Sequence, residues 1–346
     1  METPDNKQPV AGPLRVGLIA EAEEVGAYLE ALRATSALEL VAQGGMPQPA
    51  ALPAVPWFDD TRVLVAQGGV QALIIAGAPR VGVNVGAIAL ERGVHVWRPP
   101  PLGRSFAEAV EVARQVQAAG AVYRVASWWD FAGGDVRWAL EFEEGCTPVF
   151  SELRVSVAGP ALQSWRSSQT LAGGGVLLQD AYPALEALLA IRGLPESATA
   201  FLGRCRRPGT GAPRETEDIA CVILRYGGGG AALVRAAWDL PPQEYTTFHH
   251  GKQSDVRYDR QSVAVLAPDG QVRAERALPA GFLAAELARF ADQIRGPQPP
   301  PSPEKNIERH LAVSAVLEAA YLSARTEQPE APRRLFEVQK WPAPAC

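Results

Sequence analysis

Three side chains capable of proton transfer lie close together in residues 176–192, and they are the best candidates for acid–base chemistry. Asp180 could accept a proton, Tyr182 could donate one, and Glu186 follows one helical turn later. Two of them also have a structural interpretation, which we favour. Asp180 suits the N-cap of a helix, and Tyr182 suits packing at a domain seam. Asp180 and Tyr182 are therefore candidates for a catalytic base and a catalytic acid, but a structural role also explains each of them.

Other reactive side chains are scarce or badly spaced. The cysteines form no CxxC pair, and the adjacent His249 and His250 would point to opposite faces of a strand, so we predict no metal site. A lysine acid, base or Schiff base is excluded between residues 8 and 251. The four lysines of the chain are Lys7, Lys252, Lys305 and Lys340.

Length and composition limit the class of protein. The chain has 346 residues, of which 47% are hydrophobic, enough for two domains with sizeable cores. Its net charge of −5 offers no general attraction to nucleic acid or to an anionic membrane, and we expect neither as a partner. The first residues do not resemble a signal peptide and no long apolar run follows, so we expect a cytoplasmic protein.

Residues 14–121 alternate apolar strands with segments of helical periodicity. Strands are expected at 14–20, 38–42, 72–76 and 94–97. Helices are expected at 21–35, from 61 with Asp59 as N-cap, at 85–92 and at 106–119. This alternation predicts a parallel sheet in a Rossmann-like α/β domain, preceded by a flexible tail at residues 1–13.

Residues 122–340 predict an α+β domain with one large, mostly antiparallel open sheet. Glycine-containing turns separate strands at 219–226 and 231–238, and at 263–267 and 272–276, as in two hairpins. Helices are expected at 135–144, 176–192, 282–295 and 304–325, with room for the last ones to pack back on the first domain.

The order and spacing of four segments resemble the glucose-fructose oxidoreductase, inositol dehydrogenase and MocA (Gfo/Idh/MocA) family. They are residues 72–79 (ALIIAGAP), 89–120, Trp165-Arg166 with 172–193, and 282–329. The resemblance implies an NAD or NADP cofactor on the first domain and hydride transfer on a sugar, a cyclitol or a related small molecule. It also implies a homo-oligomer, a dimer or tetramer, formed through the second sheet. The cofactor positions that it assigns to this chain are Gly17, Ala20, Ala22, Gln43, Gly77 and Pro79.

The chain departs from the family at the phosphate-binding turn. Its three glycines fall on Ala20, Ala22 and Val25. Carboxylates at positions 21, 23 and 24 suit the positive end of a helix but would repel a pyrophosphate. Gln43 stands where an acidic residue would bind the adenosine ribose.

The catalytic positions depart as well. The family's lysine falls on Pro100, and its aspartate and histidine fall on Gln179 and Pro183, none of which can transfer a proton. We therefore expect a degenerate member that does not transfer hydride, a pseudoenzyme that binds a small polar ligand or a partner. The alternative is an active NAD(P)-dependent oxidoreductase that uses Asp180 and Tyr182. A third hypothesis is cofactor-independent lyase or hydrolase chemistry based on Asp180 and Glu186.

Overall fold

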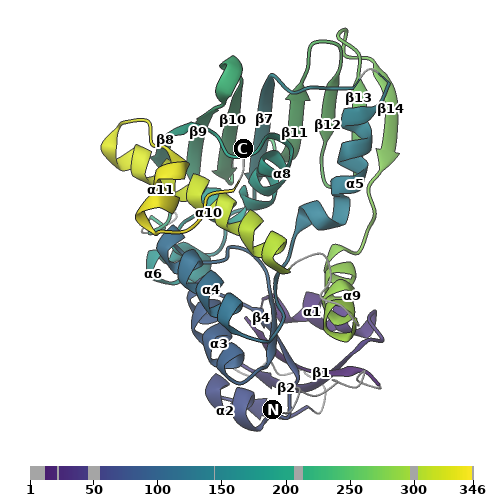
Figure 1. The fold of residues 1–346 in the computed structure, drawn as a ribbon, viewed down its shortest axis with the longest axis vertical. Coiled ribbons are helices and arrows are strands. Elements are labelled where there is room, and N and C mark those ends of the chain that lie inside the picture. Colours follow the sequence, from purple (N-terminus) through teal and green to yellow (C-terminus); the bar gives the residue numbers. More distant parts are fainter. Residues whose placement is uncertain are drawn as a thin grey trace, which may run out of the picture.

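The computed structural model describes residues 12–21, 23–45, 55–143, 145–205, 213–296 and 303–344. Two sheets stand one above the other in Figure 1, and helix α10 (Pro303–Thr326) runs beside both. The expected tail at residues 1–13 lies almost wholly outside the described residues.

The first sheet is a six-stranded parallel sheet in the order β3-β2-β1-β4-β5-β6, as expected for a Rossmann-like domain. Its strands are β1 (Leu14–Ala20), β2 (Leu38–Gly44), β3 (Trp57–Phe58), β4 (Ala72–Ala76), β5 (His95–Arg98) and β6 (Tyr123–Val125). Its helices are α1 (Val25–Arg33), α2 (Thr61–Gln67), α3 (Pro79–Glu91) and α4 (Phe106–Ala118). Because β6 belongs to this sheet, the first domain extends past the expected boundary at residue 121.

In the first domain, two helix starts and one helix cap differ from the sequence expectation. Helix α1 begins at Val25 and not at residue 21, because the residues before it form a turn closed on the Glu21 carbonyl. The side chain that caps α2 is Asp60, not Asp59. Helix α3 begins at Pro79 and not at residue 85, since proline is well suited to the first turn of a helix.

The second sheet has eight strands in the order β14-β13-β12-β11-β7-β10-β9-β8, all antiparallel except the β7–β10 pair. The strands are β7 (Phe150–Val157), β8 (Ser197–Gly203), β9 (Ile219–Arg225), β10 (Ala231–Trp238), β11 (Glu244–His250), β12 (Asp255–Tyr258), β13 (Ser262–Leu266) and β14 (Val272–Ala277). The other helices are α5 (Trp128–Glu141), α6 (Gln169–Ala172), α7 (Val176–Gln179), α8 (Tyr182–Arg192), α9 (Phe282–Arg295) and α11 (Pro332–Val338).

Helix α10 connects the cores of the two domains. Ile307 and Leu311 belong to the apolar cluster under the first sheet, whereas Val313 and Leu317 belong to the cluster under the second sheet. A helix that is apolar on more than one face is expected to be buried between layers. Helix α10 therefore contributes apolar side chains to both clusters.

The helix expected at 176–192 is interrupted. Helix α7 ends at Gln179, and α8 starts at Tyr182, with Pro183 in its first turn. The N-cap of α8 is Ala181, which makes no side-chain cap hydrogen bond, so the interpretation of Asp180 as an N-cap is wrong. The Asp180 side chain has other partners, described below.

Candidate functional site

The carboxyl ends of β1, β2 and β4 meet at a cavity of about 380 Å³, the place where a Rossmann-like sheet binds its ligand. Ala20 and Gly77, two of the positions that the resemblance assigns to a cofactor, line it together with Glu21. The wall is completed by polar and apolar side chains from the neighbouring loops and helices, among them Asp59, Thr61, Arg62, Asn84 and Ile88.

The Glu21 side chain lies against Gly77, where the absence of a side chain would let a ligand come close to the backbone. A Cβ atom placed on Gly77 would meet the Glu21 Cγ and Oε1 atoms, each at 3.6 Å. Partial burial and the neighbouring Glu23 raise the pKa of Glu21. A carboxylate therefore lies where a glycine would let a phosphate approach the backbone.

The turn before α1 uses its own backbone donors. The amides of Glu24 and Val25 both donate to the Glu21 carbonyl, at 3.0 and 3.1 Å. Burial, opposed by Arg166 and reinforced by Glu23 and Glu21, raises the pKa of Glu24 to about 7. These amides do not present a free anion-binding nest, and three carboxyl groups surround them. The residues at this turn do not fit a dinucleotide pyrophosphate.

The remaining cofactor positions are scattered. Gly17 lies within β1, where an added Cβ would come within 3 Å of the Leu64 and Leu73 side chains, so it packs against the core. Gln43 is buried, and its Oε1 has no hydrogen-bond partner among the described residues. Pro79 is buried at the start of α3. Ala22 lies outside the described residues.

Arg166 binds Gln179, at the family's aspartate position, and the neighbouring candidate Asp180. Its Nε donates to Gln179 Oε1 and its Nη2 to Asp180 Oδ2, each at 2.6 Å. Trp238 Nε1 donates to the same Asp180 oxygen at 2.7 Å. The Gln179 amide nitrogen in turn donates to the Arg166 and Gly174 carbonyls. Gln179 and Asp180 are therefore held in an internal ion-pair and hydrogen-bond cluster.

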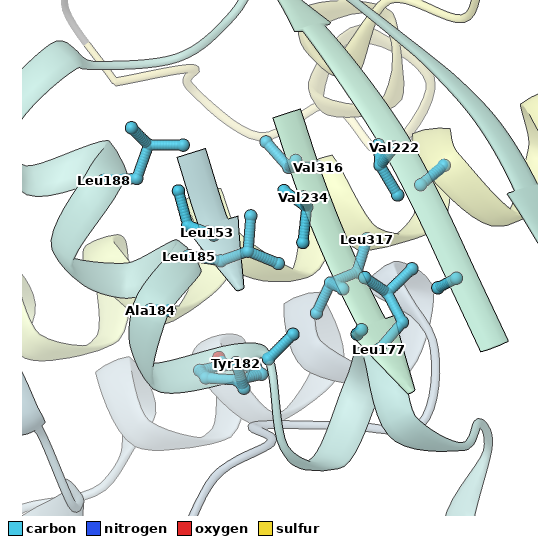
Figure 2. Close-up of a cluster of buried hydrophobic side chains, with 14 of the residues drawn as sticks. Leu153, Leu177, Tyr182, Ala184, Leu185, Leu188, Val222, Val234, Val316 and Leu317 are labelled. Atoms are coloured by element: carbon cyan, nitrogen blue, oxygen red, sulfur yellow. The ribbon is translucent and has the colours of Figure 1, made fainter. Parts of the chain in front are cut away.

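Tyr182 does not line the 380 Å³ cavity at the edge of the first sheet. It lies at the edge of the apolar cluster that contains Leu177 and Leu185 (Figure 2) and is 1% exposed. Its hydroxyl lies 3.1 Å from His310 Nδ1 and donates to the His310 carbonyl at 3.2 Å. Burial raises the pKa of Tyr182 well above its usual range. This agrees with the interpretation of Tyr182 as a packing residue at the seam between the domains.

The two domains also touch in front of α1. Ser164, from the loop after β7, donates a 3.0 Å hydrogen bond to Glu23 Oε1. Arg166 follows two residues later, and its positive charge opposes part of the rise that burial causes in the pKa of Glu24. Side chains of this chain thus bridge the gap between the turn before α1 and the acid–base positions of the second domain.

A second cavity, of about 560 Å³, lies beside this cluster, and the sequence alone did not reveal it. Its polar lining includes Arg104, Gln169, Glu217 and Tyr321. Glu217 accepts hydrogen bonds from the Gly175 and Leu177 amides at 2.7 and 3.2 Å and from the Tyr321 hydroxyl at 2.8 Å.

Burial raises the pKa of Glu217 despite these donors. A Cβ atom on Gly174 would lie 2.1 Å from the Tyr321 hydroxyl, and one on Gly175 would lie 1.8 Å from the Glu217 carbonyl. The Gly-Gly-Gly stretch, visible in the sequence, therefore packs against the wall of the cavity. Its partners, 40 or more residues away, carried no sequence signal.

Two general observations concern the described residues only. They contain no cluster of three or more His, Cys, Asp or Glu side chains that could hold a metal ion. In the same ranges, none of the helices is both long enough and apolar enough to cross a membrane.

Comparisons with known proteins agree with this fold. Residues 147–259 match the model of the GFO/IDH/MocA C-terminal domain. None of the curated protein sequences matches the chain. Three similar solved structures are all oxidoreductases, and their identities of 16–19% make the likeness one of fold.

The first is biliverdin reductase from Synechocystis, bound to biliverdin and NADP+, with 16% identity and a TM-score of 0.75 over 90% of this chain and 99% of that one. The second is the WlbA dehydrogenase from Bordetella pertussis with NADH and UDP-GlcNAcA, with 19% identity and a TM-score of 0.75 over 92% and 98%. The third is an oxidoreductase from Thermotoga maritima, with 17% identity and a TM-score of 0.76 over 93% and 99%.

Proposed function

We propose that this chain is a homologue of the Gfo/Idh/MocA oxidoreductases that binds a small polar ligand and does not transfer hydride. The match of residues 147–259 to the GFO/IDH/MocA C-terminal domain and the fold likeness to solved oxidoreductases support the proposal. Some structural neighbours bind NAD(P), which makes cofactor binding the first activity to test. The proposal rests on one observation: the chain's own side chains occupy both the cofactor side and the acid–base side of the expected site.

The observation that carries the proposal is the Arg166 cluster. A hydride transfer between a nicotinamide and a hydroxyl needs a group that exchanges a proton with that hydroxyl. Asp180, the carboxylate next to the family's aspartate position, is bound to Arg166 and Trp238, and Tyr182 is buried against His310. Gln179 has no proton to exchange. The acid–base function at these positions is therefore replaced by a structural cluster.

The cofactor side supports the same conclusion. The Glu21 side chain covers Gly77, and the amides before α1 are used in their own turn. Negative side chains at this point would repel the two charges of a pyrophosphate. The cavity beside Glu217 offers a polar wall for another ligand, with guanidinium, amide, carboxyl and phenol groups.

The test is a titration of the purified protein with NADH and with NADPH, followed by nicotinamide fluorescence and by the thermal unfolding midpoint. We expect that binding does not saturate at NADH or NADPH concentrations below about 1 mM, which corresponds to a very weak complex. The double variant Glu21→Gly/Glu24→Gln removes both carboxyl groups and should bind the dinucleotide more tightly than the wild type does. Glu30→Gln, an exposed carboxyl on the same helix, is the matched control.

Saturable binding by the wild-type protein in the low micromolar range would refute the proposal on the cofactor side. That result would favour the second candidate, an active NAD(P)-dependent oxidoreductase. The specific observation in its favour is the 380 Å³ cavity at the carboxyl edge of the first sheet, which keeps Ala20, Gly77, Arg62 and Asn84 in its wall. Oxidation of NADH in the presence of a carbonyl substrate would then establish activity.

We also propose that the second sheet forms a homo-oligomer. Helices α5, α8 and α10 lie together on one side of this sheet in Figure 1. Phe201 and Ile223, on β8 and β9, are 67% and 55% exposed. Light scattering should give a dimer or tetramer, and Ile223→Glu should shift it to monomer. Val338→Glu, at an exposed position on α11, is the control, and a monomeric wild type would contradict the proposal.

A further inference from the structure

A third cavity lies on the seam between the domains, away from both cavities described above. We call it the seam pocket, and its volume is about 270 Å³. It is lined by Arg124, Asp130, Arg289, Gln293, Lys305, Asn306 and Arg309. Four of these side chains are cationic and one is a carboxylate, whereas the chain as a whole is acidic.

A buried ion-pair network holds the wall of the seam pocket in place. Arg124, from β6, donates to both oxygens of Glu286 at 3.1 and 2.9 Å, and its Nη2 donates to Asp130 at 3.0 Å. Arg309, from α10, donates to Asp130 at 2.7 Å and lies 3.3 Å from Glu186. Since these residues come from five different elements, the wall is fixed before any ligand arrives.

The network leaves several donors unused. Arg309 and Arg289 each make their hydrogen bonds through Nη1 alone, which leaves the other guanidinium nitrogens of both residues unpaired among the described residues. The ammonium group of Lys305 and the side-chain amide of Gln293 also have no hydrogen-bond or ion-pair partner within the described part of the chain. These four side chains come from only two helices, α9 and α10.

The position of Lys305 adds an independent argument. It lies in the first turn of the 24-residue helix α10, where the helix dipole disfavours a cation and favours an anion. An anion next to Lys305 would therefore interact favourably with the ammonium group and with the helix end at once. The neighbouring Asn306 is already used, since its side chain pairs with the backbone of Val125.

We propose that the seam pocket binds the phosphoryl group of a small, soluble phosphate ester. Guanidinium groups pair with phosphoryl oxygens through parallel hydrogen bonds, and the ammonium of Lys305 adds a point charge. The arginines of the wall are already ion-paired with Asp130, Glu186 and Glu286, so what they still offer is free N–H groups. A phosphoryl group has three oxygens to accept from these donors and from Lys305, whereas a carboxylate has two. The volume of 270 Å³ exceeds that of inorganic phosphate and leaves room for a short carbon chain.

The test is isothermal titration calorimetry of the full chain with sn-glycerol 3-phosphate and with inorganic phosphate, at an ionic strength held constant with sodium chloride. Saturable binding of one equivalent is expected. Lys305→Glu should weaken it about tenfold or more, because it replaces an attraction with a repulsion at short range. Lys305 is exposed, so the variant should keep the thermal unfolding midpoint of the ligand-free protein.

Lys252→Glu makes the same change in net charge at another exposed position, in the loop between β11 and β12, and is the matched control. Equal weakening by both variants would show general electrostatic attraction and overturn the proposal. So would an absence of saturation by the wild type. Co-sedimentation with phosphatidate vesicles separates the possible sources, and vesicle binding without binding of the free ester would overturn the assignment to a soluble ligand.

Discussion

The Arg166 guanidinium lies 2.6 Å from Asp180 Oδ2, and this ion pair lies directly beside Gln179, where the family resemblance puts an aspartate. The pair is partly buried, with side-chain exposures of 26% and 17%. Arg166 also lies over the Trp238 ring, with its Cζ atom 5.7 Å from the ring centroid. An arginine that stays protonated thereby neutralises the carboxylate that could have served as the base.

Arg166→Ala tests the structural role of this pair. The variant leaves Asp180 in a partly buried place without its cation, so the free energy of unfolding should fall by about 1–3 kcal/mol. Urea unfolding measures the change. Arg225→Ala removes a more exposed guanidinium, 69% exposed and 3.5 Å from Glu196, and should change the free energy by less than about 0.5 kcal/mol. Equal losses would show that the Arg166 cluster contributes no more than an ordinary surface pair.

Glu24 gives the stability of the protein a pH dependence. Its pKa is raised from 4.5 to about 7, so the folded state must bury the carboxylate as it ionises. The unfolded chain is already ionised above about pH 4.5, and stability should therefore fall as the pH rises from 4.5 through 7. Glu186, whose pKa is also raised to about 7 by burial, acts in the same direction.

Glu24→Gln should therefore be more stable than the wild type at pH 8, by about 1–2 kcal/mol after allowance for its partial exposure, and should match it near pH 4.5. Urea unfolding at both pH values measures the difference, with Glu30→Gln as the control on the same helix. A uniform shift at both pH values would point to a change in packing and not to the charge of Glu24.

Gly175→Ala tests the wall of the cavity beside Glu217. The new methyl group would lie 1.8 Å from the Glu217 carbonyl oxygen, which also accepts the Val176 amide, and we expect a loss of about 3 kcal/mol or more. Gly134→Ala, in helix α5 with no atom within 4 Å of the added methyl, should gain about 0.5–1 kcal/mol. Thermal and urea unfolding compare the two, and a tolerated Gly175→Ala would show that the segment is free to shift.

Glu286→Ala tests the seam network. Glu286 is fully buried and accepts from Arg124, Arg289 and the Ser127 amide. Its removal leaves the buried Arg124 with only Asp130, so a loss of about 3–5 kcal/mol is expected in urea unfolding. Glu275→Ala, at a half-exposed ion pair with Arg257 on the second sheet, should cost no more than about 1 kcal/mol. A small loss at Glu286 would mean that water replaces the carboxylate.

The sequence by itself determined the two sheet architectures and the positions of most elements. Continuous apolar runs such as Leu14–Ala20, and alternating ones such as Phe150–Val157, are local signals of a buried parallel strand and a half-covered strand. Ser105 caps α4 by accepting from the Glu108 amide, three residues away, which is a local contact of the kind that a sequence pattern can indicate. The loss of the family's acid, base and glycines was equally local, since each is a change of residue type at one position.

Only the tertiary structure decided what replaced those groups. The sequence placed Asp180 at a helix start. In the structure its carboxylate instead accepts from Arg166 and Trp238, which lie 14 and 58 residues away along the chain. The seam pocket joins Arg124 to Arg309 through Asp130, and no spacing along the chain indicates that contact. Ion pairs and cavity walls depend on which side chains the packed helices and sheets bring within about 3 Å, a distance that local periodicity does not encode.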